Sequence, residues 1–147
     1  MIEQDRQRFD ELVEDEIGRL PPIARGWIDR VPVVVLDVPT NAMLESLDID
    51  SFEWTASRRT FCGLHTGVSL PRRSIEAPEA HAFDQIHLFR DGITRQAGAW
   101  DWIGDGGGED SQRALERLRR EIRITLLHEL GHHFGLDEDE LERLGFA

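Results

Sequence analysis

The longest helical pattern in the chain runs from Asp110 to Phe134, and it limits the folds that the chain can adopt. The first half of this pattern is charged, whereas the second half is apolar on nearly every side. A helix that is apolar all round belongs in the interior of a domain, so the other elements must pack around it. Gly135 is expected to end the helix, because glycine adopts the left-handed conformation of a C-cap without strain.

Two histidines and a glutamate interrupt the apolar half of this helix, in the segment His128-Glu129-Leu130-Gly131-His132. At about 100° per residue, His128 and His132 lie about 40° apart on one face, one turn from each other. This spacing lets two imidazoles bind one zinc ion. Glu129 lies on the flank of the same face, where it can act as a general base on a water. The segment therefore predicts a zinc site with its own catalytic base.

The same three residues also have a plainer interpretation. The two histidines would be hydrogen-bonded core residues, and Glu129 would be a surface charge. Burying polar groups is costly unless they are paired or bind a metal. Their position in the most apolar half of the helix therefore favours zinc.

Catalytic zinc sites usually have three protein ligands and leave one position for water. The chain turns at Gly135, so Asp137, Glu138 or Asp139 can return to the metal. In the longer metal-binding pattern H-E-x-x-H-x-x-G-x-x-H the third ligand stands three residues after the glycine, and this position is Glu138. Asp137 is better explained as the N-cap of a last short helix, because Glu140 follows it in a capping box. Glu138 is therefore the preferred third ligand, with Asp137 as the alternative.

Other polar residues of the long helix are expected to have ordinary roles. His133 points about 100° away from His132, which favours support of the ligands or packing over ligation. Three arginines lie one turn apart and are expected to pair with neighbouring glutamates on a solvated face. These residues are Arg113, Arg117 and Arg120, with Glu109, Glu116 and Glu121.

Shorter patterns predict the surrounding elements. Helical spacing predicts a helix over residues 3–19, a short helical turn over 23–30, one or two helical turns over 42–47, and a last helix that ends near residue 144. β-Branched residues predict a strand over 31–38 that is covered on both faces. Alternation predicts a second strand over 84–90, with Ile86 and Leu88 on one side and His87 and Phe89 on the other.

Glycines and prolines mark the remaining connections. Asp91-Gly92 indicates a turn after the second strand. Residues 61–68 indicate a short strand or hairpin, residues 71–78 a loop, and residues 104–108 a flexible joint. Helices and strands together indicate an α+β fold, and a length of 147 residues indicates one domain, over residues 1–147.

Composition excludes several classes of protein. The net charge of -12 repels phosphate backbones, so nucleic acid is not expected as a partner. The single cysteine, Cys62, allows no internal disulfide and no cysteine-based zinc cluster. The sequence contains no apolar run of membrane-spanning length and no readable signal peptide. A cytoplasmic location without membrane association is therefore expected.

The segment from residue 123 to residue 136, Arg-Ile-Thr-Leu-Leu-His-Glu-Leu-Gly-His-His-Phe-Gly-Leu, closely resembles a family of small bacterial zincin-like metallopeptidases, formerly described as a domain of unknown function. Residues 63–70, 86–93 and 140–145 resemble other stretches of that family. The resemblance implies a minimal zincin, in which a small mixed sheet packs on a long metal-binding active-site helix. It implies zinc at His128 and His132 and a base at Glu129. The strand at 86–90 would line the cleft, with an extended peptide added to its edge.

The chain differs from the larger zincin peptidases, and from some family members, in ways that bear on catalysis. In the sequence given, 15 residues follow His132 and none of them is methionine, so a methionine turn is not expected. Family members often carry Asp at the position of Glu138. The chain has no tyrosine, which is a common stabiliser of the tetrahedral oxyanion. His65, His87 and Arg90 are the candidates to replace it.

Three functional hypotheses follow. The leading one is hydrolysis of peptide bonds in a peptide or protein substrate, by a zinc-activated water and Glu129. The alternative is a catalytically weak or inactive zincin-like module that binds a peptide or a partner. The third is a metal-free α+β domain in which the motif arose by chance.

Overall fold

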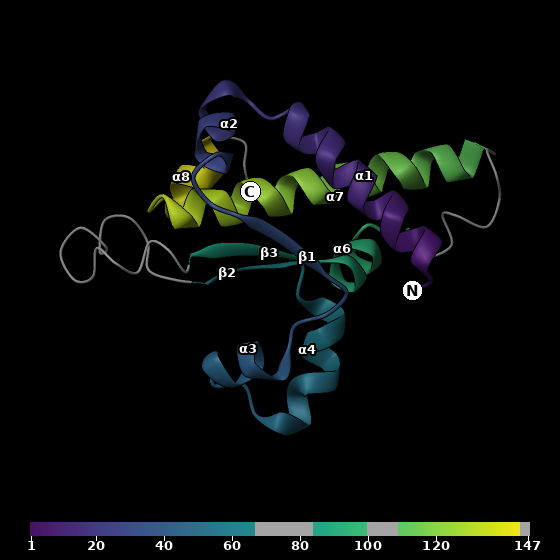
Figure 1. Cartoon of the computed structure of the whole chain (residues 1–147), viewed down its shortest axis with the longest axis vertical. Coiled ribbons are helices and arrows are strands. Elements are labelled where there is room, and N and C mark those ends of the chain that lie inside the picture. Colours follow the sequence, from purple (N-terminus) through teal and green to yellow (C-terminus); the bar gives the residue numbers. More distant parts are fainter. Residues whose placement is uncertain (67–83, 100–108, 145–147) are drawn as a thin grey trace.

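Helix α7, Glu109–His133, is the longest element of the computed structural model, and helices and strands from both halves of the chain contact it (Figure 1). The structure describes residues 1–66, 84–99 and 109–144. One face of α7 is a fully buried stripe of four residues spaced four apart: Leu118, Ile122, Leu126 and Leu130. This stripe belongs to the same hydrophobic core as Phe9 and Ile86. The predicted interior helix is therefore present, with its apolar half in the core.

A mixed sheet of three strands lies against α7 in the described part of the chain. The strands are β1, Val33–Leu36, β2, Gly63–Thr66, and β3, Gln85–Phe89. Their order is β1-β3-β2, with β1 parallel and β2 antiparallel to β3. The α+β class with a small mixed sheet on a long helix is thus confirmed. The prediction that a substrate adds to the edge of β3 is wrong, because β3 has a neighbour on both sides, and among the described strands β2 lies at the edge.

The two faces of β3 divide as the alternation predicts. Ile86 and Leu88 are fully buried in the core with the stripe of α7. His87 and Phe89 stack on each other on the opposite face, with ring centroids 6.3 Å apart. All four residues of β1 are only half-buried, so the prediction that this strand is covered on both faces is wrong.

The remaining helices surround the sheet and α7. They are α1 (Glu3–Gly18), α2 (Pro22–Ile28), α3 (Asn41–Ser46), α4 (Trp54–Thr60), α6 (Arg90–Gln96) and α8 (Glu138–Arg143). A 3-10 turn at Ser51–Glu53 precedes α4. Helices α1, α2 and α6 contact α7, and α4 contacts α6. The helix predicted at 3–19 and the helical turns predicted at 23–30 and 42–47 are confirmed, whereas α4 was not predicted.

Helix α6 replaces the turn that Asp91-Gly92 predicts. It begins at Arg90, directly after β3. A Cβ atom added at Gly92 would lie 1.9 Å from the carbonyl oxygen of Phe61, so the glycine allows α6 to touch the chain that leads into β2. Gly92 therefore serves a close approach between two elements, which the local pattern does not distinguish from a turn. The loop predicted at 71–78 and the joint predicted at 104–108 lie outside the described residues.

No helix in the described ranges combines the length and the apolar character that a membrane crossing requires.

Candidate metal centre and adjoining cavity

Three side chains converge at the C-terminal end of α7. The Nε2 atoms of His128 and His132 are 3.0 Å apart. Glu138 Oε1 lies 3.0 Å from His132 Nε2 and 3.2 Å from His128 Nε2. The side chains of His128 and His132 are 29% and 36% exposed, so the group opens to solvent on one side.

A tight turn brings Glu138 back to the helix that carries the histidines. Gly135 has φ of 83°, and the backbone N–H groups of Gly135 and Leu136 donate to the carbonyls of His132 and Gly131. This is the Schellman arrangement, and it confirms the predicted C-cap. Asp137 then caps α8 by accepting from the backbone N–H of Glu140 at 2.8 Å. Asp137 is thus occupied as a cap, and Glu138 is the residue that faces the histidines.

Gly131, inside the motif, sets how closely α8 approaches. A Cβ atom added there would lie 2.1 Å from Leu141 Cδ2. Leu141 is fully buried, so it anchors α8 against α7 at the turn where the histidines project. The short helix that carries Glu138 is therefore held by packing as well as by its cap.

The donor set fits a zinc ion. Two imidazole nitrogens and one carboxylate oxygen are the ligands of many catalytic zinc sites. The three donor atoms lie within 4.8 Å of one another, close enough to share one ion. The solvent-facing side leaves room for a water.

Glu129 lies beside this group and faces the sheet. Its carboxylate accepts a hydrogen bond from the backbone of His65, on the edge strand β2. Burial raises the pKa of Glu129, Glu138 adds to the rise, and His132 and the His65 backbone oppose it. A carboxylate with a raised pKa is a better proton acceptor, which suits a general base. The edge strand therefore orients Glu129.

Gly63 allows the strand to approach Glu129 this closely. A Cβ atom at this position would lie 2.7 Å from Thr125 Cγ2 and 3.0 Å from Glu129 Cγ. We expect Gly63→Ala to displace Glu129 and to lower any kcat/KM for peptide hydrolysis by about a hundredfold, with zinc content unchanged. Steady-state kinetics and elemental analysis measure the two quantities.

The matched control is Gly26→Ala in α2, where an added Cβ atom meets nothing within 4 Å. This control should keep full activity, since alanine is the better helix former. Equal activity in Gly63→Ala and wild type would show that the close contact between β2 and Glu129 does not contribute to peptide hydrolysis.

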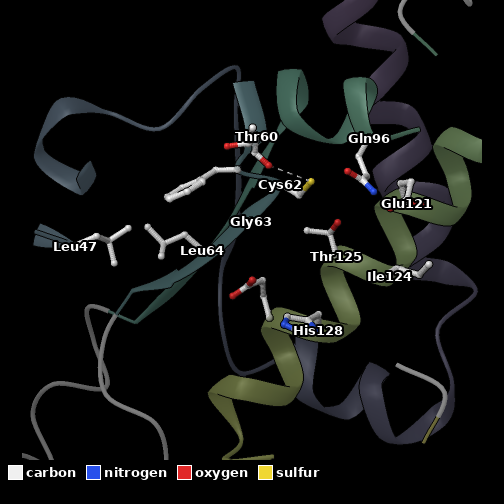
Figure 2. Close-up of a pocket in the computed structure, with 12 residues that line it drawn as sticks. Leu47, Thr60, Cys62, Gly63, Leu64, Gln96, Glu121, Ile124, Thr125 and His128 are labelled. Carbon is white, nitrogen blue, oxygen red and sulfur yellow. Dashed lines mark hydrogen bonds between the residues drawn. The ribbon is translucent and has the colours of Figure 1, made fainter. Parts of the chain in front are cut away.

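A cavity of about 530 Å³ adjoins the candidate metal centre. Figure 2 shows Gln96 and Glu121 at one end of it and His128 at the other, with Ile124 and Thr125 between them along α7. Its lining also includes Glu129 and, from the side of β2, Leu47, Phe61, Cys62, Gly63 and Leu64. The proposed base therefore faces an open, largely apolar space.

Cys62, which lines this cavity, is expected to react slowly. Burial, with help from Glu121 and Glu129, raises the pKa of its thiol to about 11. The thiolate is the reactive form, so alkylation by iodoacetamide at pH 8 should be about a hundredfold slower than for a free cysteine. The rate should rise with pH until the thiol ionises near pH 11. Mass spectrometry across pH 7 to 11 measures this, and a plateau reached by pH 9 would contradict it.

A second cluster lies behind the candidate metal centre. His133 is 2% exposed, and its Nδ1 lies 2.7 Å from His65 Nε2. Asp84, also 2% exposed, lies 3.9 Å from the same nitrogen. The three residues form a second group with metal-ligand spacing, but the two rings already share a hydrogen bond. The hydrogen bond between His133 and His65 thus ties α7 to β2. Sequence reasoning missed Asp84, which lies far away in the chain.

None of the three candidates to replace the tyrosine has its side chain in the lining of the described cavity. His65 bonds to His133. His87 lies on the opposite face of β3, where burial lowers its pKa. Arg90 forms ion pairs with Asp10 and Asp37 at 2.9 Å and 3.0 Å. The structure therefore assigns these three side chains to structural contacts.

A long helix with this motif, backed by a small mixed sheet, is the arrangement of the zincin class of metallopeptidases. The chain belongs to the zincin-like metallopeptidase family, whose model matches residues 28–146. A search of curated proteins found no match.

Proposed function

We propose that this protein is a zinc-dependent peptidase in which His128, His132 and Glu138 hold the metal and Glu129 is the general base. The observation that carries the proposal is the convergence of three donor atoms, 3.0 to 3.2 Å apart, beside a desolvated glutamate that faces a cavity. The family match supports the same activity.

Zinc bound by these residues would supply a Lewis acid that polarises the scissile carbonyl and acidifies a water. Glu129 removes a proton from the attacking water and delivers it to the leaving amine nitrogen. Its raised pKa favours the first transfer, and its hydrogen bond from β2 holds it in place. An extended peptide would bind along the edge of β2, which borders the cavity, rather than along β3.

The alternative, a weakly active or inactive module that binds peptides, has one observation in its favour. No tyrosine exists in the chain, and the three candidate substitutes make structural contacts elsewhere. A site without an oxyanion donor loses about 10² to 10³ in kcat. The two functions share the metal site and the cavity, and they differ in turnover.

We expect the zinc-loaded protein to cleave members of a mixed library of fluorescence-quenched peptides. Removal of the metal with a chelator should abolish cleavage, and one equivalent of zinc should restore it. Binding of uncut peptides by the zinc-loaded protein would support the module instead. A chain that takes up no zinc would exclude the peptidase and leave the peptide-binding module.

The expected single domain over residues 1–147 and the cytoplasmic location are part of this proposal. Helix α1 lies outside the family match but contacts α7, which supports one folding unit. The free thiol of Cys62 suits a reducing compartment. The expected partners are a peptide or protein substrate, and neither nucleic acid nor a membrane.

A further inference from the structure

The cavity follows one face of α7 away from the candidate metal centre. Glu121, Ile124, Thr125 and His128 are spaced at i, i+3, i+4 and i+7, so all four project into the same space. Glu121 is seven residues before His128, about 10 Å away along the helix axis. The cavity therefore joins the proposed reaction centre to a second carboxylate.

Glu121 is an uncompensated charge within the described residues. It is half-buried, and no hydrogen bond or ion pair connects its carboxylate to another described side chain. Arg117, four residues earlier in the same helix, donates instead to the carbonyls of Ala97 and Gly98, at 2.9 and 3.3 Å. The expected pairing of Glu121 with a neighbouring arginine is therefore absent, and the carboxylate is available to a ligand.

The rest of the lining suits an aliphatic stem. Leu47, Phe61, Leu64 and Ile124 are apolar, and no arginine contributes to the lining among the described residues. Gln96 lies at the same end as Glu121 and offers an amide oxygen (Figure 2). The Cys62 thiol donates to the carbonyl of Thr60 at 3.7 Å and so adds no cation.

We propose that this cavity is a specificity pocket for an arginine or lysine side chain of the substrate, next to the scissile bond. The stem lies against the apolar lining, and the cation meets Glu121. This inference rests on the proposed function and names the substrate class of that site.

Other substrate side chains fit this cavity less well. Short side chains do not span the distance to Glu121. Long apolar ones fill the space but leave a desolvated carboxylate without a partner, which is unfavourable. Acidic ones are repelled by Glu121 and Glu129 and by the net charge of -12.

The first experiment compares peptides that carry arginine, leucine or glutamate at each position flanking the scissile bond. Zinc-loaded wild type is expected to prefer arginine to leucine by about tenfold or more in kcat/KM at one of these positions. Glu121→Gln should reduce that ratio about tenfold. The control Glu116→Gln removes an exposed carboxylate of the same helix and should keep the wild-type ratio. Cleavage with no preference for arginine, or a ratio unchanged in Glu121→Gln, would overturn the inference and leave the peptidase proposal intact.

The second experiment needs no turnover. Nitrogen-15 NMR spectra are recorded as the protein is titrated with acetyl-arginine amide, and separately with acetyl-leucine amide. We expect saturable shifts at the amides of residues 121–125 with the arginine compound, weakened about tenfold in Glu121→Gln and reduced by salt. Such binding without cleavage of any peptide would refute the peptidase and keep the pocket. Equal binding of the two compounds would refute the pocket.

Discussion

Replacing Glu129 by Gln is expected to lower kcat for peptide hydrolysis by about a thousandfold. Glutamine keeps the shape of the side chain and its hydrogen bond from the backbone of His65, but it cannot accept the proton of the attacking water. Zinc content should stay at the wild-type level, because the proposed ligands are unchanged. Steady-state kinetics on the best library peptide, with elemental analysis of the same preparations, measure the two effects.

The same variant also tests the raised pKa of Glu129 through stability. When folding raises the pKa of a carboxyl group, as for Glu129, the protonated group stabilises the folded state at pH values below the ordinary carboxyl pKa. This stabilisation is lost as the pH rises through the pKa of the folded state, because the deprotonated group favours unfolding. Metal-free Glu129→Gln should therefore gain stability relative to wild type between about pH 4 and neutrality. A variant as active as wild type would refute the assigned base, whatever its stability.

Replacing His132 by Ala is expected to remove tight zinc binding. His132 Nε2 lies 3.0 Å from both His128 Nε2 and Glu138 Oε1, so its loss leaves two ligands where catalytic zinc sites have three. In wild type, free zinc at a hundred times its Kd should stabilise the fold by about 2.7 kcal/mol. That stabilisation should vanish in His132→Ala, as thermal unfolding with and without zinc will measure.

Two neighbouring carboxylates of α8 supply the comparison. Glu138→Ala should weaken zinc binding but leave the two histidines able to bind it loosely. Asp139→Ala removes an exposed carboxylate and should bind zinc as wild type does. Equal zinc affinity in Glu138→Ala and Asp139→Ala would exclude Glu138 as the third ligand. Full zinc binding by His132→Ala would exclude a zinc site formed by His128, His132 and Glu138.

Local signals in the sequence predicted the parts of the site that are close in the chain. The periodicity of α7 predicted a buried helix, and its end at Gly135 followed from the left-handed conformation of glycine. The cap at Asp137 directed attention to Glu138, which lies beside both histidines. Each of these inferences depends on residues within a few positions of one another.

Features that depend on contacts between distant segments were not predictable in this way. The alternation of β3 shows which face is buried, but it does not show that β2 covers one edge and β1 the other. Gly92 has the same local signature in a turn as at the contact between α6 and Phe61. Arg117 has a suitable neighbour in Glu121, yet it donates to the carbonyls of Ala97 and Gly98, which only the fold brings near. The cavity and its unpaired carboxylate are consequences of these distant contacts.

The turn at Gly135 also bears on when the site forms during folding. All three proposed ligands lie between His128 and Glu138, so closing the metal loop costs little chain entropy. Orienting Glu129 requires β2, which comes from the first half of the chain and must first pair with β3. A partly folded chain could therefore capture zinc before it could cleave a peptide. In that order, the proposed base would reach its position only after the proposed ligands had come together.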